Sequence, residues 1–159
     1  MSTRAVHLTL AVLLATYAGR GAATVPDDRP LVTVPVVVTA PTIDGRVEPG
    51  EWAGAAVTCG FRDVGTGLPA RGLVTVFLCY DARALYCRFD CRGEELTKLV
   101  GRPAARDAEI WSGSEVEVFL APLAWPTRRY AHLMVNHAGA IADETASYTH
   151  LTLPTILRV

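Results

Sequence analysis

The 159-residue sequence has little charge of either sign, a single lysine and almost no segment with the periodicity of a helix. Charged residues make up 19% of the chain and the formal net charge is −1, so no bulk electrostatic attraction favours nucleic acid or an anionic membrane. Half of the residues are hydrophobic, which excludes a disordered tail, a collagen-like fibre and a long coiled coil. The length fits one domain with short appendages.

The N-terminus has the pattern of a secretory signal peptide. Arg4 precedes an apolar run over residues 8–18, and small residues follow around Gly21-x-Ala23. The run is shorter than the roughly 20 apolar residues that a membrane-spanning helix needs. We therefore predict that residues 1–23 are removed on export. The mature chain would have 13 basic and 16 acidic residues and would be secreted, periplasmic or at the cell surface.

The C-terminus carries a different pattern. Residues 147–155 read Ser-Tyr-Thr-His-Leu-Thr-Leu-Pro-Thr, which matches, residue for residue, the translation of a transposase-based sequencing adapter. We therefore predict that residues 147–159 are foreign to the natural protein, which continues differently after Ala146. Tyr148 and His150 accordingly receive no functional role, and the domain is expected to be incomplete at its C-terminus.

Two segments between these ends alternate in apolar and polar residues with the period of β-strands. Residues 74–79 and 85–91 flank a turn and form a first hairpin, and residues 115–120 and 130–136 form a second. Gly139 and Asp143 then indicate another turn and the start of a further strand. The sequence therefore predicts an all-β fold, an antiparallel β-sandwich.

Residues 24–40 are expected to form a Pro-rich linker and a leading edge strand, which Pro35 interrupts. A short buried segment follows at residues 51–57, where Trp52 is expected to lie in the core.

The four cysteines, Cys59, Cys79, Cys87 and Cys91, are an even number in a chain predicted to be exported, which favours disulfides. Cys79 and Cys87 flank the first hairpin and are candidates to pair across it. Cys87 and Cys91 lie about 13 Å apart along one strand, at about 3.3 Å per residue, which is too far to bridge. Buried free thiols are an alternative, and zinc is a weaker one because no second matching cysteine pair exists. The connectivity stays open.

One face of the second hairpin combines polar and aromatic side chains. The alternation places Val116, Val118, Leu120, Ala131, Leu133 and Val135 in the core. The opposite face then carries Glu115, Glu117, Phe119, Tyr130, His132, Met134 and Asn136, with Trp111 just before the first strand. An aromatic ring beside carboxylate and amide groups is typical of saccharide binding. A solvated strand face, with Trp111 as a core anchor, is the alternative, and the pattern alone slightly favours it.

Five short motifs occur in a fixed order between residues 41 and 144. They are Ile43-Asp44-Gly45 with Glu51-Trp52-x-x-Ala55, Tyr80-Asp81 with Leu85-Tyr86, Arg106-Asp107-x-x-Ile110-Trp111, Val116-Glu117-Val118-Phe119-Leu120-x-Pro122, and Val135-Asn136 with Gly139 and Asp143. Their order resembles that of the family 9 carbohydrate-binding modules (CBM9). The family's fold is a β-sandwich of immunoglobulin-like architecture, related to the DOMON domains. The resemblance implies a CBM9-like domain over residues 41–146.

The resemblance also implies sugar binding, in the best-known members at the ends of plant polysaccharide chains. Such sites clamp a sugar between two tryptophans and hold its hydroxyls with charged and amide groups. Trp111 falls at one stacking position, Glu117 at the hydrogen-bonding carboxylate and Asn136 at a polar position on the adjacent strand. His132 shares their face and completes the candidate ligand-binding set.

The chain departs from the family pattern in several places. Met134 stands where a ligand-binding arginine is expected, and Ser112-Gly113-Ser114 stands where an acidic pair often follows the tryptophan. The second tryptophan would lie beyond Ala146, and Trp125 is not assigned this role.

These features predict a non-catalytic module that binds polysaccharide or oligosaccharide, at the N-terminus of a larger protein with glycoside hydrolase-type domains. No cofactor is expected beyond a structural calcium, which some family members bind. Asp44, Asp107 and Asp143 are loop carboxylates, but no dense oxygen-ligand loop is present. Neither nucleic acid nor, after signal cleavage, a membrane is expected as a partner.

Three other functions compete with sugar binding. A structural sandwich without ligand is a serious rival because of Met134. Haem binding through His132 and Met134 is disfavoured because ligands two residues apart on one strand cannot reach opposite haem faces, so His137 would be needed. Catalysis by Glu115 and Glu117, about 6.6 Å apart along the strand, is rejected. An open strand provides no cleft and nothing to separate their pKa values.

Overall fold

The computed structural model of the chain describes residues 5–13, 31–63, 65–70, 72–93, 98–102, 104–121 and 129–147. The strands are β1 (Ala5–Leu13), β2 (Ala56–Thr58), β3 (Leu73–Tyr80), β4 (Ala84–Arg92), β5 (Glu115–Leu120), β6 (Arg129–Asn136) and β7 (Ile141–Ser147). The described residues form no α-helix, and none of them belongs to a helix long and apolar enough to cross a membrane. The prediction of an all-β fold is confirmed.

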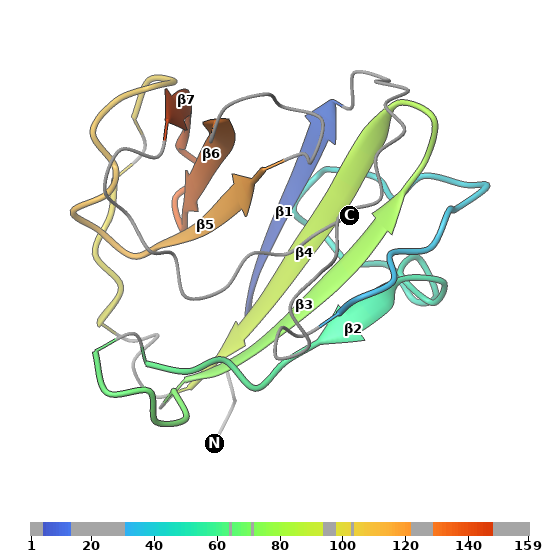
Figure 1. The fold of residues 1–159 in the computed structure, drawn as a ribbon, viewed down its shortest axis with the longest axis horizontal. Coiled ribbons are helices and arrows are strands. Elements are labelled where there is room, and N and C mark those ends of the chain that lie inside the picture. Colours follow the sequence, from blue (N-terminus) through green and yellow to red (C-terminus); the bar gives the residue numbers. More distant parts are fainter. Residues whose placement is uncertain are drawn as a thin grey trace.

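The strands form two antiparallel sheets that face each other (Figure 1). In the first sheet β4, β3 and β2 lie side by side, and β1 flanks β4 on its other edge. The second sheet has the order β5-β6-β7. Both predicted hairpins are present, β3 with β4 and β5 with β6, and the expected further strand is β7. The architecture is β-sandwich-like.

The main core lies between the sheets and is built by the alternating residues of the two hairpins. Its buried members are Val76, Leu78, Leu85, Cys87 and Phe89 from the first sheet and Val118 and Val135 from the second. Val116, Leu120 and Leu133 pack against this cluster, as the alternation predicts. Burying each such aliphatic side chain stabilises the fold by about 1.5–3 kcal/mol.

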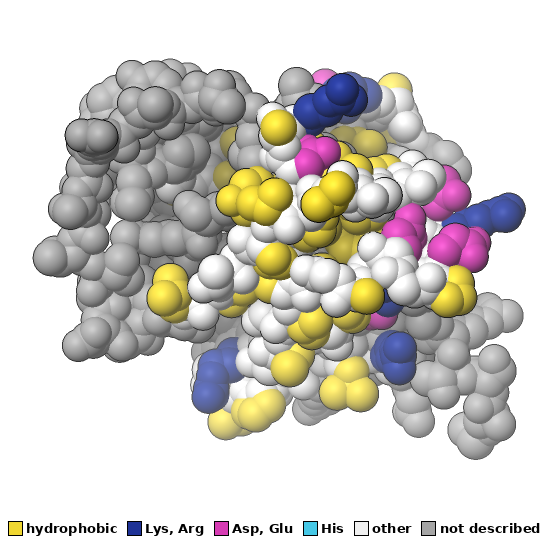
Figure 2. All heavy atoms as spheres, turned by 90° about the vertical axis from the view of Figure 1, so that its right-hand side faces the viewer, with side chains coloured by type: hydrophobic (Ala, Val, Ile, Leu, Met, Phe, Trp, Pro, Cys, Tyr) yellow, Lys and Arg dark blue, Asp and Glu magenta, His cyan; other side chains and the backbone are white. Residues whose placement is uncertain are grey.

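A second cluster covers the outer face of the first sheet, where Trp52 packs with Cys79, Ala84 and Tyr86. Val37, Val47 and Ala55, from the segment before β2, also pack against this cluster, on the right of Figure 1. Trp52 is 6% exposed, which confirms its expected place in a core. Figure 2 views this side of the molecule, where exposed hydrophobic side chains are scattered and acidic side chains gather toward one edge.

The predicted leading edge strand does not form. The segment contributes only an isolated parallel bridge between Val36 and Tyr80. Pro35 accepts from the Tyr80 N–H at 3.0 Å, and the Val37 N–H donates to the Tyr80 carbonyl at 2.8 Å. Because Pro35 has no N–H of its own, the ladder cannot extend through it.

Part of the predicted signal peptide forms a strand in this structure. β1 runs antiparallel to β4, from Ala5 opposite Arg92 to Leu13 opposite Ala84. Removing residues 1–23 on export, which stays a prediction, would leave the β4 edge without this partner. Residues 14–30 lie outside the described residues, as do all residues of the predicted adapter segment except Ser147.

All four cysteines are free thiols, so the prediction that disulfides form is wrong. Cys79 lies opposite Tyr86, whereas Cys87 lies opposite Leu78. Residues paired across two strands share a face of the sheet, and Leu78 and Cys79 are consecutive on β3, so their side chains point to opposite faces. The Cys87 thiol therefore lies in the main core and the Cys79 thiol in the outer cluster. Burial raises the pKa of Cys87 to about 12, which keeps this thiol protonated and unreactive.

Candidate functional site

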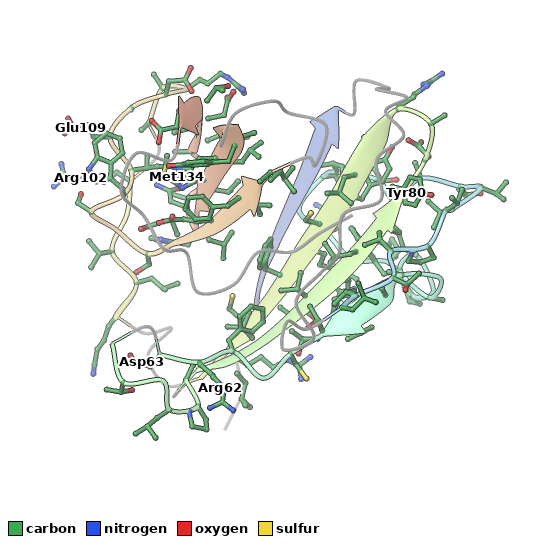
Figure 3. The ribbon with its side chains drawn as sticks, viewed as in Figure 1. Arg62, Asp63, Tyr80, Arg102, Glu109 and Met134 are labelled. Atoms are coloured by element: carbon green, nitrogen blue, oxygen red, sulfur yellow. The ribbon has the colours of Figure 1, made fainter. Side chains whose placement is uncertain are left out.

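The candidate site residues lie on the outer face of the β5-β6-β7 sheet, the face turned away from the main core. The loop before β5 passes beside this face, and Figure 3 shows Arg102 and Glu109 of that loop on the side of Met134. Met134 is buried with Ile110, Ala140 and Ala142 in a small apolar cluster. The row turns away from the main core as expected, but not all of it meets solvent: the loop covers Met134, whereas Glu117 and Glu144 are exposed.

Trp111 lies at the tip of a turn in this loop. The turn is closed by the Gly113 N–H, which donates to the Ile110 carbonyl at 3.2 Å, and Ile110 anchors it in the apolar cluster. A Cβ at Gly113 would come within 2.7 Å of the Val100 carbonyl oxygen, so only glycine fits there. The Trp111 side chain is 56% exposed, which contradicts its interpretation as a core anchor and leaves its ring free to contact a ligand.

Asn136 supports the scaffold of the site. It is 2% exposed, and its Nδ2 donates to the Arg102 carbonyl at 3.0 Å. Its Oδ1 accepts from the N–H groups of Ala138 at 3.0 Å and Ala140 at 2.9 Å. The amide thus closes the β6–β7 turn and ties the Trp111 loop to the sheet. A ligand on the surface does not reach it, so the role in ligand contact expected for Asn136 is not supported.

Replacing Asn136 by alanine is expected to lower the free energy of unfolding by about 2–3 kcal/mol, because buried N–H groups lose their acceptor. Urea denaturation measures the loss. The matched control is Ser112→Ala on the exposed turn of the same loop, for which we expect a change within about 0.5 kcal/mol. Unchanged stability with lost sugar binding would instead make Asn136 a ligand-contacting residue.

His132 lies between two carboxylates from the neighbouring strands. Its Nε2 is 2.9 Å from Glu117 Oε2 on β5, and its Nδ1 is 3.1 Å from Glu144 Oε1 on β7. The imidazole also stacks on the Phe119 ring, with centroids 4.1 Å apart and planes 13° apart. Both ring nitrogens are therefore occupied, so His132 orients the carboxylates instead of offering a free polar atom to a ligand.

Glu144 was missed by the sequence analysis. Its contact with His132 follows from the β6–β7 register, in which the two residues are directly opposite. The alternation within β6 marks His132 as outward, but the register of β7 had to be known before Glu144 could be paired with it.

The pKa of the Glu115 carboxyl group is shifted, which the strand pattern does not predict. Partial burial and the nearby charge of Glu117 raise its pKa, and its Oε2 is buried without a hydrogen-bond partner among the described residues. The environment therefore does distinguish Glu115, contrary to the expectation that nothing would separate the two carboxyl groups.

The residues considered for haem and calcium are engaged in other contacts. Met134 is buried in the apolar cluster, and both nitrogens of His132 are taken, which disfavours an axial haem pair. Asp107 Oδ1 accepts from the Asp143 N–H at 3.1 Å, and Asp143 pairs with Arg106. In the part of the chain that the structure describes, no three His, Cys, Asp or Glu side chains are grouped to hold a metal ion.

Comparisons with known proteins give no relative from which a function can be taken. No family model matches the chain, and neither a curated protein nor a solved structure matches it. Its function is therefore argued from the motifs and from the geometry of this face.

Proposed function

We propose that the chain is a secreted, non-catalytic carbohydrate-binding module of the CBM9 type, whose sugar site is the surface formed by Trp111 and Glu117. Two observations support the proposal: the indole of Trp111 is exposed on the loop that packs against this sheet, and a neighbouring histidine holds the Glu117 carboxylate in place. Trp52, in contrast, is buried in the fold. The natural partners would be polysaccharides or oligosaccharides and the downstream domains of a larger polysaccharide-processing protein.

The chemistry of the two groups suits a pyranose. The flat indole of Trp111 presents an apolar surface for the C–H face of a sugar ring. An ionised carboxylate has two acceptor oxygens, and His132 occupies one of those of Glu117, so the other can accept from a sugar hydroxyl. A fixed carboxylate loses less side-chain entropy on binding than a freely rotating one.

The packing supports this proposal because it places the loop that carries Trp111 against the face that carries Glu117. Ile110, directly before Trp111, packs on Met134, and Met134 lies opposite Glu117 in the β5–β6 register. Met134, which stands where the family has a ligand-binding arginine, thus forms an apolar anchor for the loop that carries the tryptophan. The two facing antiparallel sheets support the proposed CBM9-type fold.

The test is binding of the full chain to insoluble cellulose and xylan in pull-downs, and to cellotetraose and xylotetraose by calorimetry. We expect Glu117→Gln to weaken binding by about tenfold or more, because a charge-assisted hydrogen bond to the sugar is lost. Glu48→Gln is the matched control, since Glu48 is an exposed carboxylate in the segment over the other sheet. A folded chain that binds none of these glycans would favour the structural sandwich without ligand.

A further inference from the structure

The geometry around His132 allows more than passive support of Glu117. A carboxylate oxygen faces each ring nitrogen, Glu117 Oε2 at 2.9 Å and Glu144 Oε1 at 3.1 Å. The two carboxylates come from different strands, β5 and β7, so the imidazole joins all three strands of the sheet. His132 is only 12% exposed and stacks on Phe119, which restricts the ring from turning to other partners.

The two hydrogen bonds of His132 depend on how many protons the imidazole carries. An ionised carboxylate only accepts hydrogen bonds, and a neutral imidazole carries only one N–H. Protonated His132 therefore donates to Glu117 and Glu144 together. Neutral His132 donates to one of them and turns a nitrogen lone pair toward the other, which repels that carboxylate.

We propose that Glu144 acts through His132 as a positioning residue for Glu117, so that sugar binding is tighter with the doubly protonated imidazole than with the neutral one. This inference rests on the proposed function. The imidazolium fixes Glu117 Oε2, and the other oxygen is aimed at the sugar. With a neutral imidazole, Glu144 competes for the one N–H, and Glu117 is released for part of the time.

Among the residues that the structure describes, the groups that face His132 belong to the three strands of this sheet. Glu117 faces it from β5 and Glu144 from β7, while Phe119 covers one side of the ring. On β6 itself, Tyr130 is the titratable neighbour on the same face and packs on Phe119, with ring centroids 5.7 Å apart. Glu115 adds its charge beside Glu117.

The variant Glu144→Gln distinguishes the proposed action of Glu144 through His132 from a merely structural role of Glu144. The glutamine amide can donate to Nδ1, which selects the tautomer with its proton on Nε2. Neutral His132 then still donates to Glu117, so binding should no longer depend on whether the imidazole carries one proton or two. The variant leaves Glu115 in place, so any contribution of that carboxyl to the pH profile remains in both proteins.

The experiment measures cellotetraose affinity at pH 5 and pH 8, together with ¹⁵N NMR of the His132 ring in the full chain. We expect the wild-type affinity to fall by about twofold to fivefold at pH 8, the range typical of partly exposed charged pairs. Glu144→Gln should show a flat profile and, at pH 8, the ring signals of a single Nε2–H tautomer. The matched control Glu109→Gln, at an exposed carboxylate of the loop, should keep the wild-type profile.

Two results would overturn the inference: the same pH profile in wild type and Glu144→Gln, or ring signals that the substitution leaves unchanged. The NMR measurement needs no sugar, so it tests the hydrogen-bond coupling of Glu144 to His132 even if the proposed function fails. If the wild-type protein binds no cellotetraose at either pH, the sugar site is refuted, and with it the control of binding. A tautomer shift in Glu144→Gln would in that case still establish the hydrogen-bond coupling between Glu144 and His132.

Discussion

Replacing Trp111 by alanine is expected to weaken cellotetraose binding by at least about thirtyfold while leaving the fold intact. A central aromatic contact in a binding site contributes about 2 kcal/mol or more, and the Trp111 ring is 56% exposed at the tip of a turn. The anchor of that turn is Ile110, which the substitution does not touch. Calorimetry measures the affinity, and urea denaturation should show a stability change within about 0.5 kcal/mol.

Two controls define this result. Phe61→Ala removes another exposed aromatic ring, 43% exposed and distant in sequence, and should leave binding unchanged. Trp52→Ala removes the buried tryptophan and should destabilise the fold by about 3–5 kcal/mol. If Trp111→Ala binds as well as wild type, the sugar site is elsewhere or absent.

The second large effect is expected at Arg88, whose replacement by methionine should lower the free energy of unfolding by about 3–5 kcal/mol. Arg88 donates to both carboxylate oxygens of Asp90, at 2.7 and 2.5 Å, and the two side chains are 11% and 5% exposed. Its guanidinium also lies 4.2 Å from the centroid of the Phe77 ring and 6.0 Å from that of Trp52. The variant would leave the buried Asp90 charge without this partner.

Urea denaturation of a double-mutant cycle tests the reason for that loss. Removing both charges, in Arg88→Met with Asp90→Leu, should recover much of the stability, because no buried carboxylate then loses the guanidinium that binds it. Arg83→Met in the exposed β3–β4 turn is the control and should be nearly neutral. A double variant as unstable as Arg88→Met would show that packing, not charge, explains the loss.

Local patterns in the sequence determined the hairpins and the main core. The strand predicted at residues 115–120 coincides with β5, and the alternating apolar residues of both hairpins enter or pack against the core as expected, except Ala131, which is half-buried outside the cluster. This success has a local cause, since side chains two residues apart share a face of a strand. The same rule also marked His132 as outward from the core.

Only the tertiary structure decided which residues of the outer face meet solvent and which partners they have. The loop before β5 buries Met134 and Asn136 and presents Trp111, and alternation within a strand carries no information about a loop that crosses its face. The β3–β4 register pairs Cys87 with Leu78 and not with Cys79, so the two thiols lie on opposite faces of the sheet. The β6–β7 register brings Glu144 to His132, because pairing between strands is set by contacts far apart in the chain.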